Sequence, residues 1–220
     1  MMYNLDNLTE FPDPRNMDSD EYGYGGELTA ENLIKAYPMG IFPYYPYSED
    51  IIRWYAPQER FVIFPENIRI TDSMRQIIRK GRYRCTINEN FKETIWNCAK
   101  IDGRIYEWGA WLGPELIHVW LELNKRGYAK SVEVWNQENE LVGGLYGFVY
   151  KGCFFGDSMF SKESNTSKLA LIHLAGHMAA QGGKFIDCQL HTDHLESMGA
   201  TYISYDEYLD IINDSTPINW

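Results

Sequence analysis

The stretch from residue 185 to residue 200, FIDCQLHTDHLESMGA, holds the residues on which the interpretation of this chain depends. It contains one cysteine, Cys188, followed by His191 and His194 at a regular spacing of three residues, with acidic residues on both sides. Such a set admits three interpretations. It can be a metal site, a cysteine nucleophile with its base, or the end of a strand that carries a catalytic pair of other residues.

The first two interpretations fit the pattern poorly. Structural zinc sites usually pair their ligands as CxxC or HxxxH, with a second pair elsewhere, and the four cysteines of this chain are widely spaced with no CxxC. Cys188 lies in an apolar segment, whereas a reactive thiolate needs exposure and a cationic neighbour. We therefore expect Cys188 to be a buried, unreactive thiol.

Asp187 and Gln189 are the remaining polar pair. If residues 184–189 form a strand, the two side chains share one face, because alternate residues of a strand point the same way. A carboxylate and an amide at the exposed end of a core strand can form a hydrogen-bonded catalytic pair. The competing interpretation is that both side chains cap neighbouring loops, and the residues alone leave both open.

The composition excludes some classes of protein. A chain of 220 residues that is 45% apolar and 23% charged is typical of a globular protein, with one large domain or a core domain and a smaller partner. The net charge of -11 excludes a surface that binds nucleic acid throughout. The sequence shows no signal peptide and no apolar run of ~20 residues, which predicts a cytoplasmic protein with no membrane span.

One basic run stands out against this acidic background. Residues 71–84, TDSMRQIIRKGRYR, contain a single acid and five cations: Arg75, Arg79, Lys80, Arg82 and Arg84. The pattern predicts a helix that ends at Gly81. Its cations form either a solvated helix face or a patch that binds phosphates.

Helices and strands alternate along the chain, which indicates an α/β or α+β fold. We expect helices near residues 29–37, 71–81, 88–100, 114–127, 165–181 and 194–198. We expect strands near 51–54, 61–64 and 184–189, two or three more between 131 and 160, and a last one at 200–204.

Eight segments, taken together, resemble the leucyl/phenylalanyl-tRNA–protein transferase family. They occur in the family's order: FPDP, GGELTAENLIKAYPMGIFPY, RWYAPQER, SVEVW, LVGGLYG, FFGDSMFS, NTSKLAL and GGKFIDCQLHTDHLESMGA. The resemblance implies a Gcn5-type N-acyltransferase-like catalytic domain at 63–220 after a small N-terminal α/β domain at 1–62. It also implies a monomeric aminoacyltransferase that needs no metal or other cofactor.

The implied reaction moves Leu or Phe, less often Met, from aminoacyl-tRNA to the α-amine of proteins with N-terminal Arg or Lys. The products are marked for degradation by the N-end rule. The enzyme must align an ester with an amine, accept a proton and stabilise an oxyanion. Two other functions stay open from the residues alone, a metal- or Cys-dependent hydrolase and a non-catalytic binder of tRNA or N-terminal peptides.

The resemblance also implies roles for single residues. Gln189 faces the attacking amine, Asp187 orients it, and Asp157, where the family usually has Glu, holds a positive charge of the acceptor. The donor side-chain pocket would be formed by Leu145, Phe154, Met159 and Ile186, for which ordinary core packing is the competing interpretation. Trp54, Tyr55 and Trp111 would bind the terminal adenosine by stacking. The basic run would contact the tRNA acceptor stem.

Overall fold

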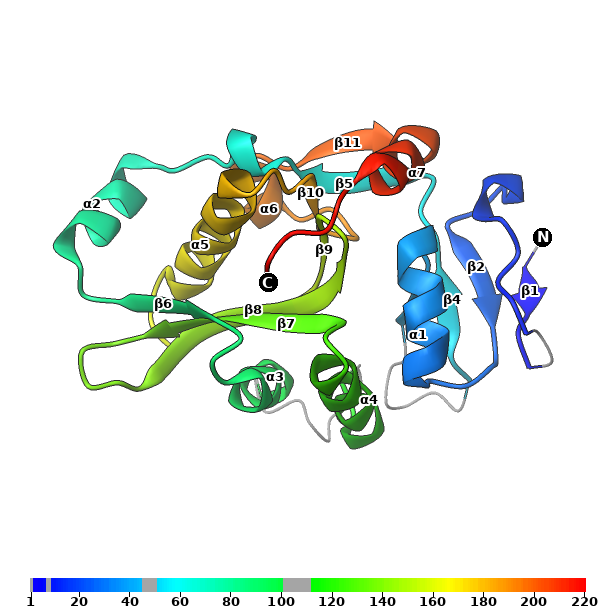
Figure 1. Ribbon diagram of the computed structural model, residues 1–220, viewed down its shortest axis with the longest axis horizontal. Helices are drawn as coiled ribbons and strands as arrows, with labels where there is room; N and C mark the ends of the chain where they lie inside the picture. The colour runs from blue at the N-terminus through cyan, green and yellow to red at the C-terminus, as the bar shows by residue number, and fades with distance from the viewer. Residues whose placement is uncertain (1, 7–8, 45–50, 101–111) are drawn as a thin grey trace.

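The computed structural model describes residues 2–6, 9–44, 51–100 and 112–220, which form two sheets with helices around them (Figure 1). The small sheet has the strand order β1-β2-β4-β3. Its strands are β1 (Tyr3–Asn4), β2 (Glu21–Tyr24), β4 (Arg53–Tyr55) and β3 (Phe42–Tyr44), and helix α1 (Ala30–Ala36) lies beside them.

The large sheet has seven strands in the order β11-β5-β10-β9-β8-β7-β6. The strands are β5 (Glu59–Ile63), β6 (Arg84–Ile87), β7 (Ala129–Trp135), β8 (Leu141–Tyr150), β9 (Cys153–Ser161), β10 (Phe185–Asp187) and β11 (Thr201–Ser204). Every pair is antiparallel except β9 and β10, which run parallel.

Helices cover both faces of this sheet. Helix α5 (Thr166–Ala180) lies on one face, and α3 (Phe91–Lys100) and α4 (Pro114–Lys125) lie on the other (Figure 1). The remaining helices are α2 (Asp72–Lys80), α6 (Asp193–Ser197) and α7 (Tyr205–Asp214), with short 3-10 turns at Pro14–Asn16, Tyr37–Met39 and Pro65–Asn67. None of the helices in the described ranges has the length and apolar character that crossing a bilayer requires.

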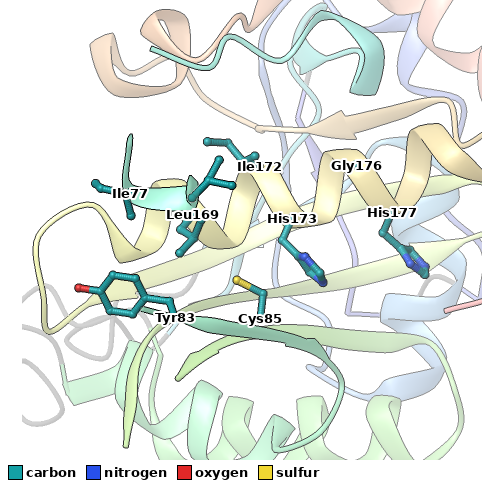
Figure 2. Close-up of a pocket in the computed structure, with 9 residues that line it drawn as sticks. Ile77, Tyr83, Cys85, Leu169, Ile172, His173, Gly176 and His177 are labelled. Carbon is teal, nitrogen blue, oxygen red and sulfur yellow. The ribbon is translucent and has the colours of Figure 1, made fainter. Parts of the chain in front are cut away.

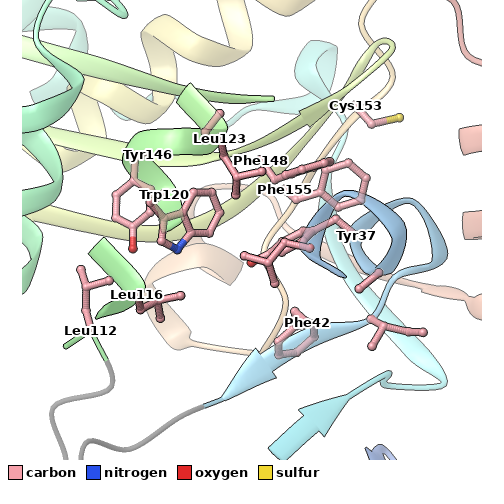
Figure 3. Packing of buried hydrophobic residues seen from close by; sticks show 14 of the residues in the cluster. Tyr37, Phe42, Leu112, Leu116, Trp120, Leu123, Tyr146, Phe148, Cys153 and Phe155 are labelled. Atoms are coloured by element: carbon pink, nitrogen blue, oxygen red, sulfur yellow. The ribbon is translucent and has the colours of Figure 1, made fainter. Parts of the chain in front are cut away.

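Two buried clusters fill the space between the sheet and its helices. Adjacent residues of one strand contribute to different clusters, as the period of two requires: Phe154 and Ile186 lie in the cluster under α5, whereas Phe155 lies in the other. Figure 3 shows the second cluster, in which the aromatic rings of Trp120 and Tyr37 meet above the sheet. Buried side chains therefore pack against both faces of β9 and β10.

Local signals explain the helix ends that the sequence predicts. The Thr29 and Thr71 side chains accept hydrogen bonds from backbone N–H groups in the first turns of α1 and α2, and Gly81 ends α2 in the left-handed conformation. Pro114 occupies the first turn of α4. These three predicted helices, and the long helix α5, are confirmed.

The structure differs from the predictions in several places, and it includes strands β1, β2, β3 and β6, which the sequence patterns do not predict. Strand β10 ends at Asp187, so the strand expected at 184–189 is shorter, and Gln189 has a positive φ of 59° that no strand residue adopts. Helix α7 follows β11 directly and was not predicted. A domain boundary between residues 62 and 63 would cut β5, which pairs with β10 and β11 in the large sheet.

Candidate active site

The site lies where β9 and β10 separate. Their pairing ends at Phe155 and Asp187, while β9 continues to Ser161 against β8 alone. Within that extension β9 has a bulge: Gly147 of β8 pairs with Gly156, but Tyr146 pairs with Ser158. Asp157 is the extra residue, and a bulge of this kind redirects the side chain it carries.

A cavity of about 400 Å³ occupies the separation between the strands. This volume is within the range typical of small-ligand sites. Its apolar wall includes all four residues predicted for the donor pocket, Leu145, Phe154, Met159 and Ile186, together with Leu171 of α5 and Leu195 of α6. Asp157, Asp187 and Gln189 also line it, so the structure brings both predicted groups into one cavity.

The two carboxylate oxygens of Asp157 differ in their hydrogen bonds. Its Oδ1 accepts hydrogen bonds from the Tyr37 hydroxyl and from the Gln189 side-chain amide, each at 3.2 Å. Its Oδ2 is shielded from solvent and has no partner among the described residues. Burial raises the pKa of Asp157 to about 7, against the two hydrogen bonds, which lower it. Asp157 can therefore gain or lose a proton near neutral pH.

Asp187 is engaged on both of its oxygens. Its Oδ2 forms a buried ion pair with the Arg60 guanidinium and accepts a hydrogen bond of 2.7 Å from the Tyr208 hydroxyl. Its Oδ1 accepts a hydrogen bond of 2.8 Å from the backbone N–H of Gln189. The carboxylate thus fixes the backbone that follows β10 and holds Gln189 in its left-handed conformation.

Arg60 connects three parts of the chain at this point. Besides Asp187, its guanidinium donates a hydrogen bond of 2.8 Å to the carbonyl of Gly40, and it stacks 4.5 Å from the ring centroid of Tyr208. Gly40 follows the 3-10 turn Tyr37–Met39, and Tyr208 belongs to α7. A buried cation needs a partner of this kind, because an unpaired charge in the interior is very costly.

The predicted geometry of the catalytic pair is wrong in one respect. The side chains of Asp187 and Gln189 do not pair on one strand face, because Gln189 lies beyond the strand; its side chain bonds to Asp157 and only its backbone to Asp187. The prediction also missed Arg60, Tyr37 and Tyr208. The sequence contains a signal for Arg60, because it directly precedes the apolar run FVIF. An arginine buried with such a strand needs a carboxylate partner.

Cys188, expected to be a buried thiol, is only partly buried and lines the cavity. Burial, with Asp187 nearby, raises the pKa of the Cys188 thiol well above its usual value, so the thiolate that a nucleophile needs is disfavoured. His194 lies in the cavity wall, whereas His191 stacks on Tyr202 outside it.

The predicted set of Cys188, His191 and His194 does not form a ligand group in the described part of the chain. The group that comes within ligating distance there is His191, Asp193 and Glu196, and all three are exposed. Exposed acidic groups of this kind are common without an ion.

Comparison with known proteins shows two family models that match most of the chain. The model of the leucyl/phenylalanyl-tRNA protein transferase family matches residues 62–213, and the model of the family's N-terminal domain matches residues 26–58. The chain belongs to this family. A curated leucyl/phenylalanyl-tRNA–protein transferase from Syntrophus aciditrophicus is 46% identical over 87% of this chain and 79% of its own length. One from Flavobacterium johnsoniae is 45% identical over 90% of this chain and 94% of its own length.

Among solved structures, L-PGS from Bacillus licheniformis is similar with a TM-score of 0.40 and 14% identity. It matches 78% of this chain and 54% of that one. A likeness at that level carries no conclusion about fold or function.

The aromatic residues that the family resemblance assigns to adenosine have different positions in the structure. The Trp54 indole is buried in the small unit, where its N–H donates to the Gly25 carbonyl at 3.0 Å, so it presents no face to a base. This part of the prediction is wrong. Tyr55 points to the other side, where it stacks with Phe42 and contacts the exposed ring of Tyr44. Trp111 lies outside the described residues.

All five cations of the basic run are exposed. Arg84 is held by Glu89 and by the Asn139 side chain, and Arg75 lies 3.8 Å from Asp72. The other three, Arg79, Lys80 and Arg82, form no ion pair with any described residue. These three exposed cations therefore follow one another closely at the end of α2 and just after it.

Proposed function

We propose that this chain transfers leucine or phenylalanine, and less often methionine, from aminoacyl-tRNA to the α-amine of proteins that begin with Arg or Lys. The observation that carries the proposal is the position of Asp157 and Gln189 at one apolar cavity. The donor's hydrocarbon side chain enters the cavity, and its ester carbon lies at the polar residues. Membership of the family supplies the class of reaction.

The transfer needs no covalent intermediate on the enzyme. The amine nitrogen forms a bond to the ester carbon, the bond between that carbon and the ribose oxygen breaks, and one proton moves from nitrogen to the leaving oxygen. A protein α-amine has a pKa of about 7.7–8.0, so a useful fraction is neutral at physiological pH. Alignment of the two reactants is then the main task of the site.

Gln189 acts in this scheme as a positioning group at the reacting centre, because an amide is a poor base. Asp157 meets the positive charge of the acceptor, either the α-ammonium or the side chain of Arg or Lys. Its Oδ2 is the oxygen that remains for this contact, since Oδ1 already accepts from Tyr37 and Gln189. Asp187 orients the amine indirectly, through the backbone of Gln189.

The apolar cavity accounts for the choice of donor. Phe154 and Ile186 are nearly fully buried, and their packing makes the wall rigid. A wall of this kind excludes β-branched Ile and Val by steric clash, whereas a missing contact alone would discriminate only weakly. Leu, Phe and Met share an unbranched Cβ and fit the same entrance.

We also propose a domain organisation, a cellular location and an oligomeric state for this protein. Residues 63–220, together with the rest of β5, form a Gcn5-type N-acyltransferase-like domain after a small N-terminal domain, and the enzyme is a cytoplasmic monomer whose products are degraded by the N-end rule. The divergence of β9 and β10 supports the acyltransferase description, since it opens a cleft at the centre of the sheet.

A transfer assay tests this proposal. Purified protein, Leu-tRNA and a peptide that begins with Arg should give a Leu-Arg peptide, and Asp157→Asn and Gln189→Ala should both lower the rate. Cys188→Ala is the matched control, because Cys188 lines the same cavity but its thiol has no role in the reaction. No transfer by the wild-type protein, or loss of activity in Cys188→Ala alone, would overturn the proposal.

A further inference from the structure

A second cavity, of about 520 Å³, lies away from the reacting centre, between α5 on one side and α2 with β6 on the other (Figure 2). Side chains from both sides point into it, and its lining includes Ile77, Ile78, Tyr83, Ile172, His173 and His177. We call this space the α2–α5 groove. Nothing in the acyl-transfer reaction requires it.

The groove combines three properties. Its walls contain aliphatic side chains, and one of these, Ile78, is 45% exposed although an isoleucine is usually buried. It has flat rings, namely Tyr83 and the imidazoles of His173 and His177. The segment between the lining residues Ile78 and Tyr83, which we call the rim, carries three exposed cations, Arg79, Lys80 and Arg82, that form no ion pair with any described residue, on a protein whose net charge is -11.

We propose that the α2–α5 groove receives an unpaired nucleoside of the tRNA, while the cations at its rim hold the adjoining phosphates. This inference rests on the proposed function. Bases of any kind stack on flat side chains, and a basic border that follows the backbone accompanies such stacking in single-strand binding sites. Phosphate contacts position a nucleic acid, which leaves the groove to take a base that is not in a helix.

The position of the groove fits a single bound tRNA. Helix α5 separates the two cavities: Leu171 lines the donor cavity, and the next residue, Ile172, lines the groove. A tRNA whose aminoacyl end enters the donor cavity can pass over α5 and reach α2. The charge of the rim favours a polyanion over an apolar segment of a protein, for which these cations would have no counterpart.

Gly176 provides a direct test. It lines the groove in the middle of α5, and a Cβ built there meets nothing within 4 Å. The Cβ of Gly176→Leu therefore meets no steric obstacle, the rest of its side chain reduces the space in the groove, and leucine suits a helix better than glycine. Ala180→Leu is the matched control, because it adds the same side chain to the exposed surface of α5 one turn further on, outside the groove.

The assay compares two donors, Leu-tRNA and leucyl-adenosine, which carries only the terminal nucleoside. We expect Gly176→Leu to raise the KM for Leu-tRNA roughly fivefold or more, from the loss of one stacked base, with unchanged transfer from leucyl-adenosine. Ala180→Leu should change neither. Chemical probing should show an unpaired tRNA base that the wild type protects and Gly176→Leu does not.

An unchanged KM for Leu-tRNA in Gly176→Leu, or an equal loss with both donors, would overturn the proposal. In the first case the groove binds something other than tRNA, and in the second the substitution acts through the fold. If the wild-type protein transfers leucine from neither donor, the proposed function fails instead, and the two failures are thereby distinguished.

Discussion

Removal of the Arg60 guanidinium should affect two properties that can be measured separately, the stability of the molecule and the alignment of its active site. Arg60 and Asp187 are each 1% exposed, and together they connect β5, the end of β10 and Gly40, which follows the 3-10 turn Tyr37–Met39. In Arg60→Met the buried Asp187 carboxylate keeps only two donors, the Tyr208 hydroxyl and the Gln189 N–H. We therefore expect both stability and turnover to fall.

The size of the stability loss follows from the burial of the pair. Removing one partner of a buried ion pair leaves an uncompensated charge and costs about 3–5 kcal/mol. For a chain of this length each kcal/mol lowers the Tm by about 2–4 °C, so the Tm should fall by roughly 6–20 °C. Domains are stable by about 5–15 kcal/mol, so the variant should still fold at low temperature.

The effect on turnover is a matter of alignment. Asp187 holds the backbone of Gln189 through the bond to its Oδ1, and a shift of about 1 Å at a reacting centre can cost on the order of 10²-fold in rate. We expect kcat to fall by that order while the KM for Leu-tRNA changes by less than about threefold, since the substrate contacts remain. Urea unfolding and single-turnover transfer, both far below the Tm, measure the two effects.

A double substitution decides between a structural and a positioning role. Arg60→Met with Asp187→Leu replaces the ion pair by apolar side chains, an exchange that often restores stability. The Gln189 N–H loses its acceptor in the double variant, so transfer should stay low. Recovery of stability and activity together would refute the positioning role, and a stability loss below about 1 kcal/mol in Arg60→Met would refute the buried pair itself.

Three further predictions concern the other parts of the site. Because the pKa of Asp157 is raised from 3.8 to about 7, the wild-type protein should lose stability relative to Asp157→Asn as the pH rises from about 4 to about 7, and the difference should stay constant above that range. Asp157→Asn should also lose a rise in kcat/KM centred near pH 7. Leu145→Phe narrows the donor cavity and should lower transfer of Phe more than transfer of Leu, measured with the two charged tRNAs; equal losses would remove Leu145 from the pocket. Charge reversal at Arg79 and Arg82 should reduce the salt dependence of tRNA binding by roughly one unit of slope per lost phosphate contact, and an unchanged slope would exclude the patch.

The sequence predicts those parts of the molecule that depend on local signals. Caps and turns are local, which is why the bounds of α1, α2 and α4 could be expected from Thr29, Thr71, Gly81 and Pro114. The apolar wall could also be predicted as a set of residues, although only the resemblance separated it from ordinary core packing. The structure then brings the whole set into one cavity.

The rest depended on contacts between distant parts of the chain. Periodicity predicts a strand through residue 189, but the hydrogen bond from the Gln189 N–H to Asp187 turns the chain after residue 187. The bulge that redirects Asp157 is visible only in the register of β8 and β9. The residue type of Trp54 does not distinguish a base-binding role from a core role. Its burial follows from the position of β4 between β2 and β3.

These contacts also narrow the choice of proton acceptor. Both oxygens of Asp187 already have donors: Oδ2 pairs with Arg60 and accepts from Tyr208, and Oδ1 accepts from the Gln189 N–H. A proton on this carboxylate would remove the charge that pairs with Arg60. Gln189 is an amide and cannot hold the proton. Asp157 has a shielded Oδ2 with no partner in the described part of the chain, and its pKa of about 7 is close to that of the acceptor amine. The residue in which this chain departs from the family's usual glutamate is thus the one whose environment suits it best to exchange a proton during transfer.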